Sequence, residues 1–113
     1  MKIAIIGSRN LTCVDIHKYI SLNCTEIVSG GARGVDTMAA EYAQQNNIPI
    51  TVFKPDYEKF GRAAPIVRNK QIVDYADEVI AFWDGKSKGT RSVIQYCEKT
   101  SKPCRIITID AER

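Results

Sequence analysis

Segments with the hydrophobic pattern of buried strands alternate with amphipathic segments along this chain. The pattern predicts strands at residues 2–6, 25–28, 48–53, 78–82 and 104–109, and helices at residues 14–22, 35–45, 65–75 and 90–99. Polar loops are expected at 54–64 and 83–89, and a frayed tail at 110–113. Such alternation favours a parallel sheet, because each helix carries the chain back across it. We therefore expect an α/β fold, a doubly wound parallel sheet of about five strands with helices on both faces.

Composition is that of an ordinary globular chain, and a single domain over residues 1–113 is expected. Hydrophobic residues make up 44% and charged residues 26% of the sequence. The net charge of +3 is small, whereas dedicated duplex-binding domains are usually more basic. No apolar run approaches the ~20 residues that a membrane span needs. The first run stops at Gly7-Ser8-Arg9 and lacks a signal-peptide pattern, so we expect no membrane and a cytoplasmic location.

Cysteine and histidine are placed without the spacing of a metal site. The four cysteines, at positions 13, 24, 97 and 104, form no C-x-x-C pair, and His17 has no ligand partner nearby in the sequence. We expect reduced thiols, no metal and no cofactor. A single histidine far from the glycine-rich segments also argues against histidine-based acid–base catalysis.

A glycine-rich segment, Ser29-Gly30-Gly31-Ala32-Arg33-Gly34-Val35-Asp36, joins the second predicted strand to the second predicted helix. A turn of this kind exposes backbone N–H groups at a helix N-terminus, where anions bind. The segment is neither a dinucleotide fingerprint nor a Walker A loop. Asp36 has two interpretations, a helix-capping role or a contact with a ribose hydroxyl. The candidate residues for a phosphate-bearing ligand are Ser29, Gly30, Gly31, Arg33, Gly34 and Asp36.

Two further loops follow strands of the predicted sheet and carry similar residue types. In parallel α/β sheets, ligands bind outside the carboxyl ends of the strands. The loop after the first strand and the loop after the fourth strand are therefore expected at the same edge as the glycine-rich segment. Each loop is also consistent with a solvated turn. Their candidate ligand-binding residues are Gly7, Ser8, Arg9, Asp84, Gly89 and Thr90.

The third predicted helix carries the adjacent pair Arg68-Asn69. Helical spacing places Asn69 on one face with Ile66, Val73 and Ala76. A buried amide without a partner costs about 1–3 kcal/mol, so Asn69 requires either a backbone partner or a ligand. Arg68 adjoins that face and reaches the same pocket in this interpretation. Aromatic residues beside the long loops either stack on a flat base or cover the core edge: Tyr57, Phe60 and Trp83.

The order of these motifs resembles the SLOG superfamily, which includes the DNA-processing protein DprA and the LOG phosphoribohydrolases. The closest likeness is to the small stand-alone proteins of the YspA-like type. The resemblance implies a Rossmann-like fold that binds nucleotides or nucleotide-derived ligands. The resemblance also implies that residues 29–36 bind the phosphate of the ligand. Arg68 resembles an active-site arginine of the LOG enzymes, and Gly89-Thr90 is similar to the end of their Pro-Gly-Gly-x-Gly-Thr motif.

The sequence departs from the LOG pattern at two places. Residues 84–88 replace the Pro-Gly-Gly part, and Ser92 stands where those enzymes carry a catalytic glutamate. The leading prediction is a domain that binds or senses a nucleotide or a nucleotide derivative. One alternative is a nucleotide N-glycoside hydrolase in which Arg68 is the candidate catalytic residue. A second alternative, by similarity to DprA, is binding of single-stranded DNA. Relatives of this kind often form homo-oligomers.

Overall fold

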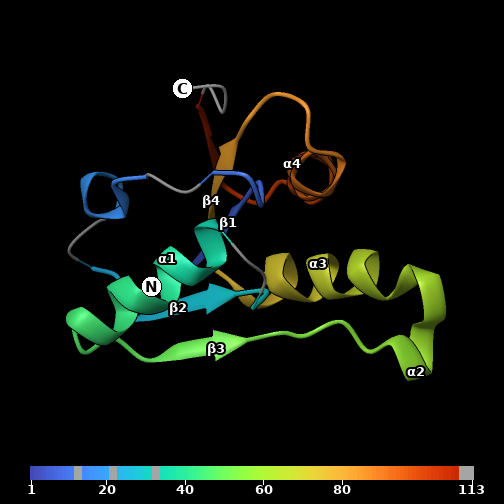
Figure 1. Ribbon diagram of the computed structural model, residues 1–113, viewed down its shortest axis with the longest axis horizontal. Coiled ribbons are helices and arrows are strands. Elements are labelled where there is room, and N and C mark those ends of the chain that lie inside the picture. Colours follow the sequence, from blue (N-terminus) through green and yellow to red (C-terminus); the bar gives the residue numbers. More distant parts are fainter. Residues whose placement is uncertain (12–13, 21–22, 32–33, 110–113) are drawn as a thin grey trace.

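A computed structural model of the protein describes residues 1–11, 14–20, 23–31 and 34–109 (Figure 1). Within these residues the strands form one parallel sheet in the order β3-β2-β1-β4-β5. The strands are β1 (Lys2–Gly7), β2 (Glu26–Ser29), β3 (Ile50–Val52), β4 (Glu78–Trp83) and β5 (Cys104–Thr108). The predicted α/β fold with a parallel five-stranded sheet is confirmed.

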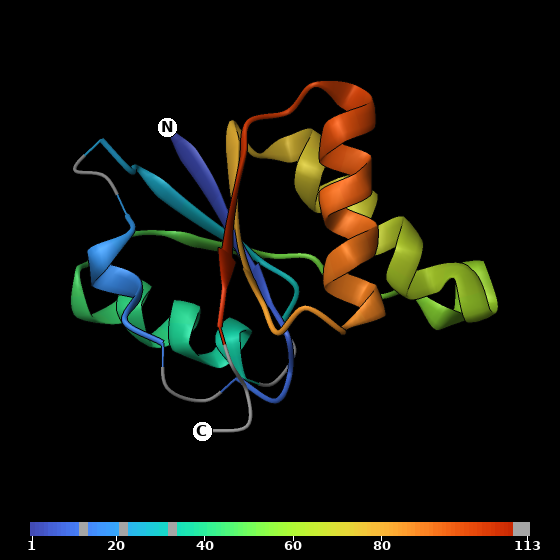
Figure 2. The same ribbon diagram turned by 90° about the horizontal axis from the view of Figure 1, so that it is seen from above.

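Helices cover both faces of the sheet (Figure 2). One face carries the helix α1 (Val35–Gln45) and the short 3-10 helix η1 (Ile16–Lys18), and the other carries α3 (Ala64–Tyr75) and α4 (Lys88–Thr100). Strand β1 is buried on both sides: Ile3 and Ile5 pack beneath α1, while Ala4 and Ile6 pack beneath α3 and α4. This double burial explains why the central strands read as continuous apolar runs.

The chain order places a topological switch point at the carboxyl end of β1. From β1 the chain proceeds outward to β2 and β3, then returns to the other side of β1 to form β4 and β5. The connections therefore diverge on either side of β1, which opens a crevice at that edge. The loops that follow β1, β2 and β4 meet there. No helix within the described ranges is long and apolar enough to cross a membrane.

Two sequence predictions were wrong. The helix predicted at 14–22 is only the 3-10 helix Ile16–Lys18 within the part described, and residues 21–22 lie outside it. Asp15 provides no side-chain cap, and Ile16 alone in η1 is buried, so neither capping nor an apolar stripe supports a longer helix. The loop predicted at 54–64 contains the helix α2 (Tyr57–Phe60) and the 3-10 helix η2 (Gly61–Ala63).

An N-cap at Asp56 explains where α2 begins. The Asp56 side chain accepts a hydrogen bond from the Lys59 backbone N–H at 3.2 Å. Aspartate is among the preferred N-cap residues, because its carboxylate satisfies an N–H that has no partner within the helix. The two following helices begin slightly earlier than predicted, at Ala64 and at Lys88.

Candidate ligand-binding cavity at the switch point

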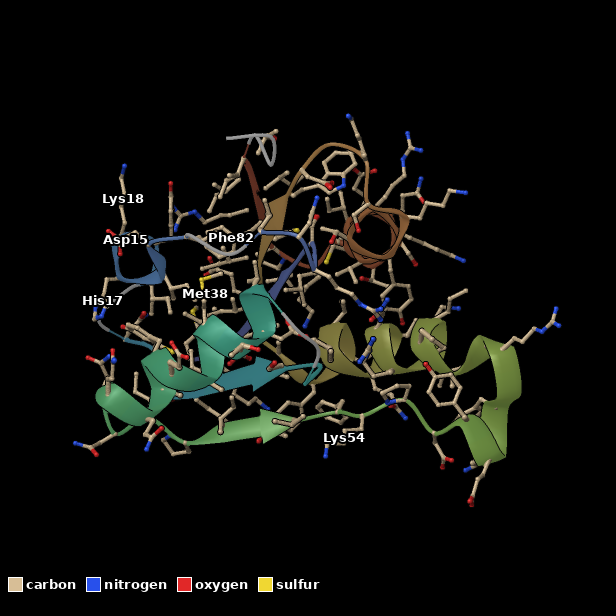
Figure 3. All side chains as sticks on the ribbon, viewed as in Figure 1. Asp15, His17, Lys18, Met38, Lys54 and Phe82 are labelled. Atoms are coloured by element: carbon tan, nitrogen blue, oxygen red, sulfur yellow. The ribbon has the colours of Figure 1, made fainter. Side chains whose placement is uncertain are left out.

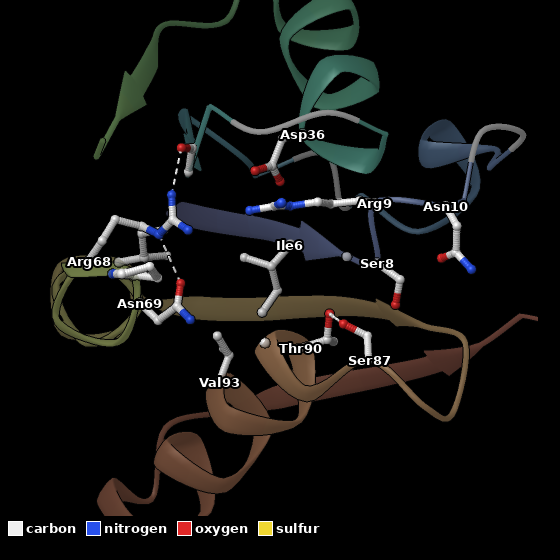
Figure 4. A pocket seen from close by; sticks show the side chains of 15 residues that line it. Ile6, Ser8, Arg9, Asn10, Asp36, Arg68, Asn69, Ser87, Thr90 and Val93 are labelled. Atoms are coloured by element: carbon white, nitrogen blue, oxygen red, sulfur yellow. Dashed lines mark hydrogen bonds between the residues drawn. The ribbon is translucent and has the colours of Figure 1, made fainter. Parts of the chain in front are cut away.

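A cavity of about 430 Å³ opens at the carboxyl end of β1, between the turn after β2 and the helices α3 and α4 (Figure 4). Most of the predicted site residues line it: Gly7, Ser8, Arg9, Gly30, Asp36, Arg68, Asn69, Gly89 and Thr90. Four other predicted residues do not: Ser29, Gly31, Gly34 and Asp84. Arg33 lies outside the described residues. The sequence-distant loops therefore do converge on one space.

Arg68 anchors one wall of the cavity. Its Nη1 donates a hydrogen bond to the Gly30 carbonyl at 2.8 Å, and its Nε donates to Asn69 Oδ1 at 2.9 Å. The residue is only 9% exposed. Burial lowers the pKa of the Arg68 guanidinium, and the charge of Asp36 opposes that shift. Arg68 thus ties α3 to the turn after β2, in addition to presenting a positive charge.

The hydrogen bond from Arg68 to the backbone of the turn requires a glycine at position 30. A Cβ atom at position 30 would lie 2.8 Å from Arg68 Nη1 and 3.2 Å from the Asp36 carboxylate. The 2.8 Å contact is shorter than Cβ atoms adopt and the 3.2 Å contact is tight, so a side chain here would require the guanidinium to shift. The glycine therefore lets the arginine and the carboxylate meet over the backbone of the turn.

Arg9 and Asp36 complete this wall. The Arg9 side chain extends across the cavity below Asp36 and toward Arg68 (Figure 4). Its positive charge contributes to lowering the pKa of Arg68. Asp36 is buried in the first turn of α1. Two guanidinium groups and one carboxylate thus face the same space, a set that we call the charged wall (Arg9, Asp36 and Arg68), and it carries a surplus of one positive charge.

The remaining glycine-turn residues shape the turn rather than line the cavity. Gly34 has φ +73°, and a Cβ there would lie 2.6 Å from the Arg9 carbonyl oxygen. Position 34 accepts only glycine, because the backbone at the N-terminus of α1 packs directly against the backbone of Arg9, just after β1. The Ser29 Oγ accepts a hydrogen bond from the Gly31 N–H at 3.2 Å and so closes the turn.

The opposite wall is the N-terminus of α4. Ser87 is the N-cap residue, but its side chain makes no capping hydrogen bond. The Ser87 Oγ instead donates a long hydrogen bond of 3.5 Å to the Thr90 Oγ1. Thr90 is itself only 5% exposed. The hydroxyl of Ser8 is also buried there and accepts a hydrogen bond from the Asp84 N–H at 3.3 Å. We call Ser8, Ser87, Gly89 and Thr90 the hydroxyl wall.

Asp84 builds the loop that supports the hydroxyl wall. Its Oδ1 accepts hydrogen bonds from the N–H groups of Ser87 at 2.7 Å and Lys86 at 2.9 Å. These bonds, the one from Ser87 first, lower the pKa of the Asp84 carboxyl. Trp83 closes the same loop, because its Nε1 donates to the Ser87 carbonyl at 3.0 Å. Trp83, Tyr57 and Phe60 do not line the cavity.

The partner of Asn69 is neither of the two that the sequence predicts. The two alternatives were a backbone group or a ligand, whereas Oδ1 accepts from its neighbour Arg68. The predicted apolar face of this helix is also shifted, because Ile66 is 51% exposed while Arg68 is buried. The displacement follows from the hydrogen bond to Gly30, which draws Arg68 inward.

Several lining residues were not predicted. They are Ile6, Asn10, Pro65, Ile72, Ser87 and Val93. The apolar members look like ordinary core residues in a sequence, so no signal distinguished them. Ser87 carried a signal only for a helix that begins at Lys88, where it is the N-cap residue, and the predicted helix begins two residues later. His17 lies elsewhere, near Met38 on the α1 face (Figure 3), and its ring packs edge-on against Tyr42 at 4.6 Å.

The fold places the chain among Rossmann-like α/β proteins, and its cavity lies at the sheet's switch point, where such folds bind ligands. The family model of the YspA, cpYpsA-related SLOG family matches residues 1–60, and the chain belongs to this family. The match includes the turns after β1 and β2, and residues 61–113 lie beyond it. Neither the curated proteins nor the solved structures contain a match. The predicted SLOG membership is confirmed, and it suggests a role in binding a nucleotide-related ligand.

Proposed function

We propose that this protein binds a nucleoside monophosphate, or a close derivative, in the cavity at the end of β1. The observation that carries the proposal is the pairing of two different polar walls across one cavity. The charged wall lies on one side, the hydroxyl wall on the other, and apolar residues lie between them. A nucleotide has matching parts, since it joins an anion and a sugar diol to a flat, largely apolar base.

The hydroxyl wall suits the phosphate. The first N–H groups of α4 lack intrahelical partners, and the side chain of the N-cap residue Ser87 does not cap them. The helix dipole favours an anion at this end, and the Thr90 hydroxyl adds a donor. A Cβ on Gly89 would meet nothing within 4 Å, so a ligand has room to approach the backbone. No carboxylate from the described residues lines this wall.

The charged wall suits the sugar better than the phosphate. Asp36 repels a phosphate but accepts hydrogen bonds from sugar hydroxyls, as acidic residues do for ribose in other nucleotide-binding folds. The Arg68 guanidinium already donates hydrogen bonds to Gly30 and Asn69. The Arg9 guanidinium is exposed and extends across the cavity. Arg9 supplies the positive charge that offsets the phosphate charge. This assignment differs from the sequence prediction that residues 29–36 grip the phosphate.

Binding is favoured over N-glycoside hydrolysis. Hydrolysis of that bond needs a carboxyl group that assists the departing base or activates water. Within the described lining residues, Asp36 is the one carboxylate, and Ser92 does not reach the cavity. Asp36 faces the guanidinium groups of Arg9 and Arg68, and in this position the carboxylate suits hydrogen-bond acceptance from a ligand.

Calorimetric titration with nucleoside monophosphates, the matching nucleosides and inorganic phosphate tests the proposal. The monophosphates should bind saturably at one site, and the nucleosides at least about tenfold more weakly, because they lack the charged hydrogen bonds. Thr90→Val and Arg9→Ala should each weaken binding by about tenfold or more.

The matched control is Arg91→Ala. Arg91 is exposed on α4 and does not line the cavity, yet its loss removes the same charge as Arg9→Ala. The Arg91→Ala variant should bind nucleoside monophosphates with an affinity close to that of the natural protein. The proposal is wrong if no monophosphate binds, or if Arg91→Ala weakens binding as much as Arg9→Ala.

A further inference from the structure

We infer that Asn69 selects nucleotides whose base presents a carbonyl oxygen, hypoxanthine, guanine or uracil, over those that present an amino group at the same position. The inference rests on the proposed function and names the class of base. It follows from the direction in which the Asn69 amide is fixed.

The orientation of the amide is determined by its neighbour. Arg68 Nε is a donor and has no acceptor capacity, so the atom of Asn69 that faces it at 2.9 Å must be the carbonyl Oδ1. Reversing the amide would set the Nδ2 donor against the Nε donor. Arg68 cannot turn away easily, because its Nη1 is held by the Gly30 carbonyl at 2.8 Å within a buried site.

The amide therefore offers the cavity only a donor. With Oδ1 directed at Arg68, Nδ2 points into the cavity on the side of Ile6 (Figure 4). No hydrogen bond joins Nδ2 to another of the described residues, and Asn69 lines the cavity. An Nδ2 hydrogen bond is thus available to an acceptor on the ligand and unavailable to a donor.

The surface around Nδ2 suits a base rather than a phosphate. Ile6, Ile72 and Val93 are buried core residues that also line the cavity. Ile72 follows Asn69 by three positions on α3 and so lies on the same side of the helix. A flat base that lies on these apolar side chains directs its polar edge toward Nδ2.

The distinction between bases follows from their edges. The inference sets position 6 of a purine, or position 4 of a pyrimidine, against Nδ2. Hypoxanthine and guanine present the acceptor O6 at that position, whereas adenine presents the N6 amino donor. Uracil likewise presents O4 where cytosine presents an amino group. A donor facing a donor loses the hydrogen bond and leaves both groups unpaired, which costs about tenfold in affinity or more.

Titrations of the full chain with inosine and adenosine monophosphate, and with uridine and cytidine monophosphate, test the inference. Each pair carries the same sugar and phosphate, so its affinity ratio isolates the base edge. We expect the carbonyl member of each pair to bind about tenfold more tightly. Asn69→Asp keeps an acceptor for Arg68 Nε but presents an acceptor to the cavity, so it should reverse both ratios. Any charge repulsion in this variant acts on both members of a pair.

Asn69→Ala provides a second variant in case the aspartate variant does not fold, and it should bring both ratios close to one. Equal or tighter binding of the amino members by the natural protein overturns the inference and leaves the proposed function standing. The inference is also overturned if neither Asn69→Asp nor Asn69→Ala changes the two affinity ratios. Failure of all four nucleotides to bind overturns the proposed function, and this inference with it.

Discussion

Replacing Arg68 by leucine should destabilise the protein by about 2 kcal/mol even without a ligand. The substitution removes a charged hydrogen bond to the Gly30 carbonyl at 2.8 Å, worth about 1.5–3 kcal/mol. It also removes the bond to Asn69 at 2.9 Å, which is only partly buried and so is assigned the lower value of about 0.5–1.5 kcal/mol. Leucine recovers about 1 kcal/mol through burial of its apolar surface at this largely buried position. The net loss reflects the role of Arg68 as a tie between α3 and the turn after β2.

Urea unfolding followed by circular dichroism measures this loss. The matched control is Arg62→Leu, because Arg62 is exposed on η2 and does not line the cavity. The control should change the free energy of unfolding by less than about 0.5 kcal/mol. Arg68→Lys keeps the charge but cannot bond two groups in the same planar geometry, so its stability should fall between those of the natural protein and Arg68→Leu. The reasoning is refuted if Arg68→Leu is as stable as Arg62→Leu.

Three further substitutions test other parts of the account. Gly34→Ala should lose at least about 2 kcal/mol in urea unfolding, because the φ of +73° is strained for alanine and its Cβ would meet the Arg9 carbonyl; a neutral effect would contradict this. Gly89→Ala should instead raise stability by up to about 1 kcal/mol while weakening nucleotide binding in calorimetry, since only the ligand needs the open space; unchanged binding would count against the phosphate assignment. Tyr75→Phe should lower stability near neutral pH but not in acid. The hydrogen bonds from Tyr75 and Thr51 lower the pKa of Glu26 below 4.5, so their stabilisation is present above that pH and is lost as the pH falls through the folded-state pKa. Unfolding experiments at about pH 7 and about pH 3 should show a narrowing gap between Tyr75→Phe and the natural protein, and a constant gap would exclude this origin.

The central strands β1 and β4 could be predicted because they are buried on both faces and form short apolar runs between turn residues. The helix predicted at residues 14–22 was wrong because Val14, Ile16 and Ile20 have the spacing of a loose apolar stripe on a helix. Of these three, only Ile16 is deeply buried. Residues 57–60 lie in a polar segment that favours a loop, and Asp56 is the one N-cap signal for the short helix that forms there.

The glycine and charged residues that line the cavity are distinctive in the sequence, whereas its apolar lining residues are ordinary. Gly30 and Arg68 stood out in the sequence, and they meet in the structure through a hydrogen bond. Ile6 and Val93 could not be distinguished from other core residues, because a lining role depends on which apolar side chains the crevice leaves uncovered. The partner of Asn69 could not be predicted either, since it depends on the inward turn of Arg68.

Amide NMR during a titration with inosine monophosphate tests the central claim most directly, because each residue reports separately on the ligand. The account predicts saturable shifts concentrated at Gly30, Asn69, Gly89 and Thr90, which line the cavity. Residues on the α1 face, such as Met38 and Tyr42, should remain unchanged. Shifts centred on that face, or the absence of saturable shifts at the cavity, would contradict the proposal that this protein binds nucleotides at the switch point of its sheet.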